Sequence, residues 1–219
     1  MGAMSLTVAT WNINSVRLRI ANVTRFLRLR KPDVLCLQET KCPDEFFPHK
    51  PFEKLGYTHR LVQGMKSYNG VAILSKVPFT AMNVHHRCGK EDCRHIEVAL
   101  DVGDLNVAPL EHDVWSHKQM LKVISHTPTE CEKLTAVQKI GNWVDTMRVH
   151  TPEPEKLYTW WSYRAMENWR ISDRGRRLDH IWTSNAIADR VSRIKVYKDY
   201  RGYERPSDHV PVTATFELN

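Results

Sequence analysis

Residues 6–39 read LTVATWNINSVRLRIANVTRFLRLRKPDVLCLQE, and this stretch decides the fold class. Apolar residues alternate with period two over Leu6–Trp11, which predicts a strand. Over Ser15–Arg30 the apolar residues gather near one face of a helix, and Pro32 ends that helix. The apolar run Val34–Glu39 then predicts a buried strand. A strand, a helix and a second strand in direct succession are typical of an α/β domain.

The rest of the chain continues this pattern. Further strands are predicted for Gly70–Ser75, Tyr158–Ser162, Leu178–Thr183, Arg193–Tyr197 and Val210–Phe216. A helix is predicted to begin at Thr129, because Thr129 and Glu132 have the spacing of a capping box, and to run into Trp143 and Met147. No repeat, low-complexity tract or long linker divides the chain, so residues 5–219 are expected to form one domain.

Composition and charge favour a soluble globular protein with an anionic partner. Hydrophobic residues make up 42% of the chain and charged residues 26%, which is ordinary for such a protein. Lys and Arg exceed Asp and Glu by 7, and the pI is about 9.2, so the surface attracts polyanions such as nucleic acid. No apolar run approaches the roughly 20 residues that span a bilayer. Residues 1–4 resemble an expression remnant rather than a signal peptide, which points to the cytoplasm. We also expect a monomer.

The cysteines do not suggest a disulfide framework, because five is an odd number. Cys36 lies in an apolar run and is expected to be a reduced core residue. Cys88 and Cys93 lie near three histidines, but the second Cys/His pair of a zinc site is missing. A zinc site therefore stays a weak alternative for this segment.

Acidic and amide residues repeatedly follow the apolar runs. They are Asn12, Asn14, Glu39, Asp104, Asn106, Asp179 and Asp208, with His209 next to the last. Any one of them could cap a helix or start a turn. Carboxylates that converge at strand ends need a positive partner, and a hard divalent cation, which prefers oxygen ligands, can neutralise several of them at once. In a basic chain, this set indicates a metal-dependent phosphodiester hydrolase, in which a metal polarises the phosphoryl oxygen and other groups position water.

One junction does not read as a natural chain. Ile96–Leu100 is predicted to be a strand, and Asp101–Asn106 has the pattern of the end of another. Even the tightest hairpin needs about two loop residues, and a parallel neighbour needs a crossover of about a dozen or more. We therefore expect that a segment is missing near residues 100–102.

The motifs that carry these residues resemble the exonuclease III family of abasic-site endonucleases, within the DNase I-like endonuclease, exonuclease and phosphatase superfamily. They are residues 11–17 (WNINSVR), 37–41 (LQETK), 68–75 (YNGVAILS), 103–106 (GDLN), 158–164 (YTWWSYR), 175–180 (GRRLDH) and 205–211 (RPSDHVP). The resemblance runs from Leu6 to the C-terminus. It implies a four-layer α/β sandwich, in which two packed mixed sheets are flanked by helices. It also implies a DNA repair nuclease that cuts 5′ of abasic sites in duplex DNA and trims or unblocks 3′ ends.

The resemblance assigns a role to each site residue. The ligands of Mg²⁺, or of Mn²⁺ in its place, would be Glu39 first, with Asn12, Asp104 and Asp208 nearby. Asp104 would position or activate water beside Asn106, and His209, oriented by Asp179, would contact the scissile phosphate. Contacts with DNA would come from Arg17, Lys41, Tyr68, Asn69, Trp160, Arg176 and Leu178. Trp160 and Leu178 would line the pocket for an abasic sugar that is flipped out of the duplex, although Trp160 could instead be a core aromatic.

The chain departs from the family at the suspect junction. There the relatives carry a strand, a loop and a helix, and the loop holds a Tyr-x-Pro motif whose tyrosine contacts the phosphate. Three explanations stay open: an unresolved loop absent from the sequence, an engineered deletion, or a naturally shortened protein. Two alternative functions stay open with them. One is a superfamily phosphodiesterase that acts on another phosphate ester, and the other is a catalytically impaired DNA-binding protein.

Overall fold

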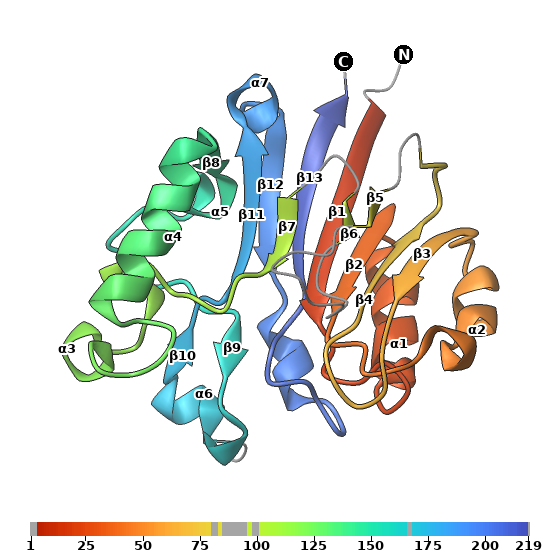
Figure 1. The fold of residues 1–219 in the computed structure, drawn as a ribbon, viewed down its shortest axis with the longest axis horizontal. Helices are drawn as coiled ribbons and strands as arrows, with labels where there is room; N and C mark the ends of the chain where they lie inside the picture. The colour runs from red at the N-terminus through yellow and green to blue at the C-terminus, as the bar shows by residue number, and fades with distance from the viewer. Residues whose placement is uncertain (1–3, 80–82, 85–95, 98–100, 166–167, 219) are drawn as a thin grey trace.

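The fold is that of a computed structural model, which describes residues 4–79, 83–84, 96–97, 101–165 and 168–218 (Figure 1). Cys88 and Cys93, the weak zinc candidates, lie outside the described residues, as do residues 98–100 of the suspect junction. No helix in the described part of the chain is long and apolar enough to cross a membrane.

The larger sheet has six strands in the order β12-β13-β1-β2-β4-β3. Its strands are β1 (Met4–Asn12), β2 (Val34–Gln38), β3 (His59–Gln63), β4 (Val71–Ser75), β12 (Val191–Val196) and β13 (Val212–Leu218). β1 and β2 pair in parallel, because helix α1 (Ile20–Arg30) returns the chain between them, and the other pairings are antiparallel.

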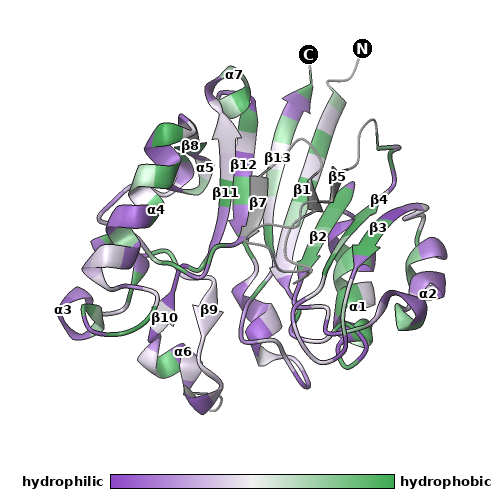
Figure 2. Cartoon of the chain, viewed as in Figure 1, coloured by the Kyte–Doolittle hydropathy of each residue, from purple (hydrophilic) through white to green (hydrophobic). Residues whose placement is uncertain are grey.

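Both faces of this sheet are buried, as β1 shows. Val8 packs with Ile181 in the core between the two sheets, whereas Ala9 and Trp11 pack with Phe26 in the core under α1. A strand buried on both faces is apolar along most of its length. Figure 2 accordingly shows β2 in hydrophobic colours, and the runs at β1 and β2 were correctly predicted as strands.

The smaller sheet has three described strands in the order β7-β11-β8. They are β7 (Asp101–Asp104), β8 (Trp143–Asp145) and β11 (Asp179–Ser184), and all pair antiparallel. β7 lies against β1 and β2 of the larger sheet. Short ladders join β5 (Asn83–Val84) to β6 (Ile96–Glu97) and β9 (Trp160–Trp161) to β10 (Gly175–Arg176).

Helices cover both outer sides of the sheets. Figure 1 shows α1 and α2 (His49–Glu53) on one side, and α3 (His117–Met120), α4 (Pro128–Ile140) and α5 (Thr146–His150) on the other. The remaining helices are α6 (Trp169–Ser172), α7 (Asn185–Ala188) and 3-10 turns at Asp44–Phe46, Glu111–Asp113, Tyr163–Ala165 and Lys198–Gly202. The order helix, sheet, sheet, helix confirms the predicted four-layer α/β sandwich.

The predicted helix start at Thr129 was wrong. α4 begins at Pro128, and Thr127 is its N-cap, because the Thr127 hydroxyl accepts a bond from the Glu130 amide while Glu130 reaches back to the Thr127 amide at 3.1 Å. The helix also ends at Ile140 rather than running to Met147, and Trp143 begins β8. Proline fits the first helical position, because its missing N–H has no partner there in any case.

The start of α1 also differs from the prediction. α1 begins at Ile20 rather than Ser15, because residues 16–19 form turns and Ser15 has a left-handed backbone with a φ of 85°.

β7 lies at the edge of its sheet within the described residues, since β11 is its one described ladder partner. The missing segment near residues 100–102 stays a prediction.

Candidate active site

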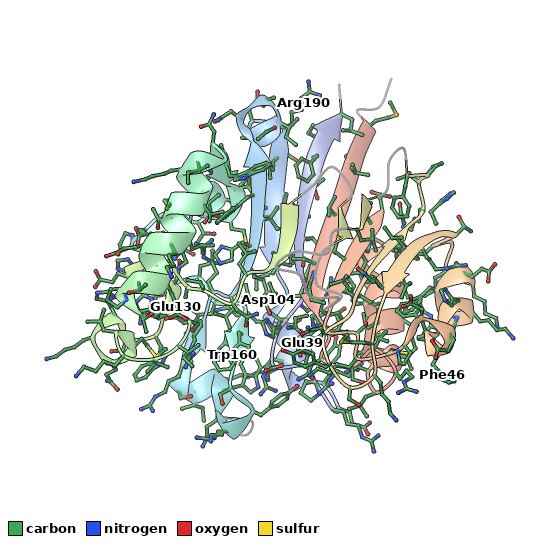
Figure 3. All side chains as sticks on the ribbon, viewed as in Figure 1. Glu39, Phe46, Asp104, Glu130, Trp160 and Arg190 are labelled. Carbon is green, nitrogen blue, oxygen red and sulfur yellow. The ribbon has the colours of Figure 1, made fainter. Side chains whose placement is uncertain are left out.

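The side chains that follow the strands meet at one end of the two sheets. Asn12 ends β1 and Glu39 follows β2, and these strands run in parallel. Asp104 ends β7 directly opposite Asp179, the first residue of β11. Figure 3 shows the labelled side chains of Glu39, Asp104 and Trp160 in this region. The topology therefore brings together acids that are far apart in the sequence.

Asn12 lies at the centre of the cluster and is buried. Its Nδ2 donates hydrogen bonds to Glu39 Oε1 and to Asp104 Oδ2, both at 2.9 Å. Its backbone carbonyl accepts a 2.7 Å bond from the Ser207 hydroxyl. Asn12 thus holds one carboxylate from each sheet and fixes their separation.

The Asp104 carboxylate also accepts two hydrogen bonds from Asn106. The Asn106 amide N–H reaches Oδ1 at 2.8 Å, and Asn106 Nδ2 reaches Oδ2 at 3.0 Å. Burial raises the pKa of Asp104 to about 6, against the lowering effect of the His209 charge. Asp104 is therefore an ionised but readily protonated group near neutral pH.

His209 and Asp179 form a buried charged pair. His209 Nδ1 lies 2.9 Å from Asp179 Oδ2, and the side chains are 4% and 0% exposed. Burial alone would lower the pKa of His209, but Asp179 and Asp104 raise it to about 10. Nε2 lies 3.8 Å from Asp104 Oδ2, which is too long for a hydrogen bond. The imidazolium can therefore offer its Nε2–H to another acceptor.

Glu39 is paired with Lys41. Lys41 Nζ lies 2.8 Å from Glu39 Oε2 and donates a 2.7 Å bond to Asn14 Oδ1. Burial raises the pKa of Glu39, but the hydrogen bonds from Lys41 and Asn12 outweigh this and hold it below its usual value. Lys41 was predicted to face DNA, and in the structure its ammonium group neutralises Glu39.

Asp208 joins the cluster to an aromatic side chain. Its Oδ2 accepts a 3.0 Å bond from Trp160 Nε1, and its Oδ1 accepts a 3.3 Å bond from Asn14. Burial raises the pKa of Asp208, but the His209 charge and the Trp160 bond hold it below its usual value. Leu178 and Trp160 pack in the same apolar cluster, and their role in lining a sugar pocket stays a prediction.

The donor set fits a hard divalent cation. Glu39, Asp104, Asp179 and Asp208 bring four carboxylates together, whereas Lys41 and His209 bring two positive charges. Oxygen ligands of this kind suit Mg²⁺ or Mn²⁺. One oxygen of Asp104, one of Asp179 and a His209 nitrogen lie within 4.8 Å of one another. A protonated imidazole has no lone pair for a metal, so the carboxylates are the candidate ligands of this cluster.

Two contact residues, Tyr163 and Arg19, had no predicted role, and Asn14 was predicted only as a member of the converging set. Tyr163 Oη accepts bonds from Asn14 Nδ2 at 3.0 Å, from Arg19 Nη2 at 2.9 Å and from the Asp208 amide at 3.2 Å. Arg19 also donates to the Asn14 carbonyl. Asn14 and Tyr163 lie inside the motifs of residues 11–17 and 158–164, and this was the available signal.

Other predicted DNA contacts lie around the cluster. Arg17 is exposed in the turn before α1, and Tyr68 is 56% exposed. The Asn69 carbonyl accepts a 2.8 Å bond from the Lys41 amide, which places the loop of residues 68–70 beside the site. Contact of these residues with DNA stays a prediction.

Several site residues have a left-handed backbone. The φ angle is 46° at Asn14, 51° at Glu39 and 55° at Asn106. For residues other than glycine this conformation is unfavourable, and it persists where surrounding contacts enforce it. The strand ends are thus bent to direct these side chains into the cluster.

The sequence profile of the Endonuclease/Exonuclease/phosphatase family matches residues 9–209. The chain belongs to this family. Exodeoxyribonuclease III of Haemophilus influenzae is 25% identical and aligns with 95% of this chain and 98% of its own length. DNA repair nuclease APEX1 of Danio rerio is 28% identical over 96% of this chain and 82% of its own. This member of the family is a phosphodiester hydrolase.

Solved structures of family members have the same fold. An AP endonuclease from Archaeoglobus fulgidus superposes with a TM-score of 0.90 at 27% identity, covering 97% of this chain and 100% of the other. A 3′-5′ exonuclease from Neisseria meningitidis has a TM-score of 0.88 at 28% identity, with the same coverage. This protein therefore has the DNase I-like fold.

The sequence alignments with DNA repair nuclease APEX1 and exodeoxyribonuclease III are longer than this chain. They extend over 263 and 267 positions, whereas the chain has 219 residues. The relatives therefore carry residues for which this chain has no counterpart, whose place along the chain stays a prediction.

Proposed function

We propose that this nuclease hydrolyses the phosphodiester 5′ of abasic sites in duplex DNA, and that it trims or unblocks 3′ ends in a reaction that needs Mg²⁺. The observation that carries the proposal is the 3.8 Å separation of Asp104 Oδ2 and His209 Nε2. At this separation the carboxylate and the imidazolium can act on one phosphate group. Relatives named as AP endonucleases and exonucleases support the choice of DNA. A cytoplasmic monomer is part of the same proposal.

Asp104 is the group that acts on water. At neutral pH it is ionised, because burial raises its pKa only to about 6. Asn12 and Asn106 occupy its oxygens with hydrogen bonds and so fix the direction of the remaining lone pairs. A water held there is oriented for attack and can give its proton to the carboxylate.

His209 is the group that acts on the phosphate. Its Nδ1 is engaged by Asp179, so Nε2–H points away from the pair and can donate to a phosphate oxygen. The positive charge then stabilises the negative charge that develops in the transition state. Because the ring is already oriented and buried, little reorganisation accompanies the reaction.

Glu39 and Asp208 would hold the metal, and Asn12 would keep Glu39 in place. When bound, Mg²⁺ supplies Lewis-acid polarisation of a phosphoryl oxygen. The ammonium group of Lys41 lies 2.8 Å from Glu39 Oε2. When the metal binds Glu39, this ion pair would have to break, or the metal would have to use the other carboxylate oxygen.

The test is cleavage of a duplex with one stable abasic analogue, with Mg²⁺ and then with EDTA. We expect a cut 5′ of the analogue that requires the metal, and no comparable cut in the matched undamaged duplex. Binding without cleavage would favour a catalytically impaired DNA-binding protein. Hydrolysis of a non-nucleic phosphate ester in preference to this duplex would favour the other superfamily function.

A further inference from the structure

The hydroxyl group of Tyr163 joins three segments that meet at the cluster. Tyr163 begins the 3-10 turn that follows β9. Its Oη accepts hydrogen bonds from Asn14 Nδ2 at 3.0 Å, from Arg19 Nη2 at 2.9 Å and from the Asp208 amide at 3.2 Å. Its own proton is donated to the Pro206 carbonyl at 3.4 Å. One oxygen atom therefore fixes the loop after β1, the turn before α1 and the loop before β13 relative to one another.

These contacts use the whole hydrogen-bonding capacity of the hydroxyl group. A tyrosine hydroxyl has two lone pairs and one proton. In Tyr163 three donors share the lone pairs, and the proton has an acceptor. Tyr163 is therefore placed to act through its protein neighbours rather than on the substrate.

Asn14 transmits the position of this hydroxyl group to two carboxylates. Asn14 Nδ2 donates to Tyr163 and also to Asp208 Oδ1, at 3.3 Å. On the other side of the same amide, Asn14 Oδ1 accepts a 2.7 Å bond from Lys41 Nζ. Lys41 in turn pairs with Glu39 Oε2 at 2.8 Å. The direction of the Asn14 amide thus affects both Asp208 and Glu39, and Tyr163 fixes that direction by accepting from its nitrogen.

Two buried arginines hold Tyr163 itself. Arg19 is 8% exposed, and besides Tyr163 its guanidinium group donates to the carbonyls of Arg205, at 3.1 Å, and Asn14. The guanidinium carbon of Arg201 lies 5.3 Å from the centre of the Tyr163 ring. A buried charged donor that loses its acceptor is strongly unfavourable, so Arg19 resists any displacement of the hydroxyl group.

We propose that Tyr163 is a positioning residue for the metal site. Its hydroxyl group keeps Asn14 and Asp208 in the arrangement that binds the divalent cation. The proposal rests on the function proposed above, in which Glu39 and Asp208 hold the metal. Hydrogen-bond partners that orient metal ligands commonly change metal affinity by roughly 10–100-fold.

The test is Tyr163→Phe, which removes the hydroxyl group and keeps the ring. The probe is Mn²⁺, because electron paramagnetic resonance measures the free ion directly in the absence of DNA. We expect the variant to raise the Kd for Mn²⁺ roughly 10–100-fold. In the cleavage assay, excess Mg²⁺ should restore most of the single-turnover rate of Tyr163→Phe. A smaller folded fraction would lower the rate at every Mg²⁺ concentration instead.

Tyr158 provides the matched control. It lies in the same motif of residues 158–164, is 1% exposed, and its hydroxyl group has no hydrogen-bond partner among the described residues. Tyr158→Phe therefore removes the same atom from a buried tyrosine without releasing a contact of the cluster. The Kd for Mn²⁺ should stay at the wild-type value in this variant.

Arg19→Gln tests the same contact from its other side, and it keeps the test valid if Tyr163→Phe does not fold. It should raise the Kd for Mn²⁺ by a smaller factor than Tyr163→Phe. In the double variant the two factors should not multiply, because both act through one hydroxyl group.

An unchanged Kd in Tyr163→Phe would overturn the positioning role, and so would an equal rise in both phenylalanine variants. If Tyr163→Phe does not fold, an unchanged Kd in Arg19→Gln overturns it. A wild-type protein that binds Mn²⁺ but does not cut an abasic duplex would remove the proposed function alone, and the comparison of Kd values would still decide the role of Tyr163. A wild-type protein that binds no Mn²⁺ would overturn both.

Discussion

Replacing Asp179 with asparagine removes the charge that faces the catalytic imidazole and keeps a side chain of the same shape. Asp179 Oδ2 lies 2.9 Å from His209 Nδ1, and both side chains are buried. Asp179, together with Asp104 and Asp208, raises the pKa of His209 from 6.5 to about 10 against the opposing effect of burial. In the variant only Asp104 and Asp208 oppose burial, so the pKa of His209 should fall toward 6.5.

The size of the effect follows from these values. At pH 8 a group with a pKa of 6.5 is charged in about 3% of molecules, whereas a group with a pKa of about 10 is charged in nearly all. The rate should therefore fall at least about 30-fold at pH 8 from lost charge alone, within the roughly 10²–10⁴-fold range of a positioned acid–base group. The folded pKa of His209 lies above its unfolded value. The pair therefore stabilises the fold fully below pH 6.5, and this stability is lost as the pH rises through about 10.

The assay is the single-turnover cleavage rate of an abasic duplex across pH. The wild-type rate should rise as Asp104 ionises near pH 6 and fall near pH 10 as His209 loses its proton. Asp179→Asn should shift the alkaline fall of the pH–rate profile to a pH several units lower. Asp173→Asn is the control, because Asp173 bonds to Trp161 Nε1 at 3.0 Å and does not contact His209. If the cleavage rate of Asp179→Asn still falls only near pH 10, this account of the imidazolium is refuted.

Four further outcomes are expected. Glu39→Gln should weaken Mg²⁺ activation but not DNA binding, because it removes a charged oxygen ligand, and an unchanged Mg²⁺ titration would remove Glu39 from the metal site. Asp104→Asn and His209→Asn should each slow single-turnover cleavage roughly 10²–10⁴-fold, and their effects should not add in the double variant; full rates in folded variants would contradict both roles. Asp113→Ala leaves the buried Arg177 with Asp145 as its remaining carboxylate partner and should lower the unfolding free energy in urea by about 3–5 kcal/mol; a loss under about 1 kcal/mol, the upper end for exposed pairs, would show that the Asp113 pair is dispensable. Duplex affinity should fall linearly with salt on logarithmic axes, with a slope of about −0.9 per phosphate contact, and insensitivity to salt would exclude phosphate contacts.

The sequence predicted the convergence of the acids because each of them closes an apolar run. Asn12 and Glu39 end parallel strands, and the ends of parallel strands share one edge of a sheet. The position of Asp104 opposite Asp179 required the antiparallel pairing of β7 and β11. That pairing joins segments far apart along the chain, which no local pattern encodes, and the family resemblance implied only that Asp104 and Asp179 act in one site.

The partner of each side chain was harder to predict. The resemblance implied that Lys41 faces DNA, but it did not indicate that the ammonium group of Lys41 pairs with the half-buried Glu39 carboxylate at 2.8 Å. Tyr163 was missed, since its bond to Asn14 spans 149 residues. The start of α4 was misplaced because Thr127 and Thr129 both precede a glutamate by three residues, and Pro128 decides between them.

The left-handed strand ends have a consequence for how this protein can change over generations. Backbone strain of this kind is unfavourable by about 1–3 kcal/mol at each residue. Asn14→Gly would relieve the backbone strain at its φ of 46°. It would also delete the amide that holds Asp208 and Lys41. Selection for thermal resistance alone should therefore accumulate glycine at these bends and erode turnover, whereas selection for turnover should keep them strained.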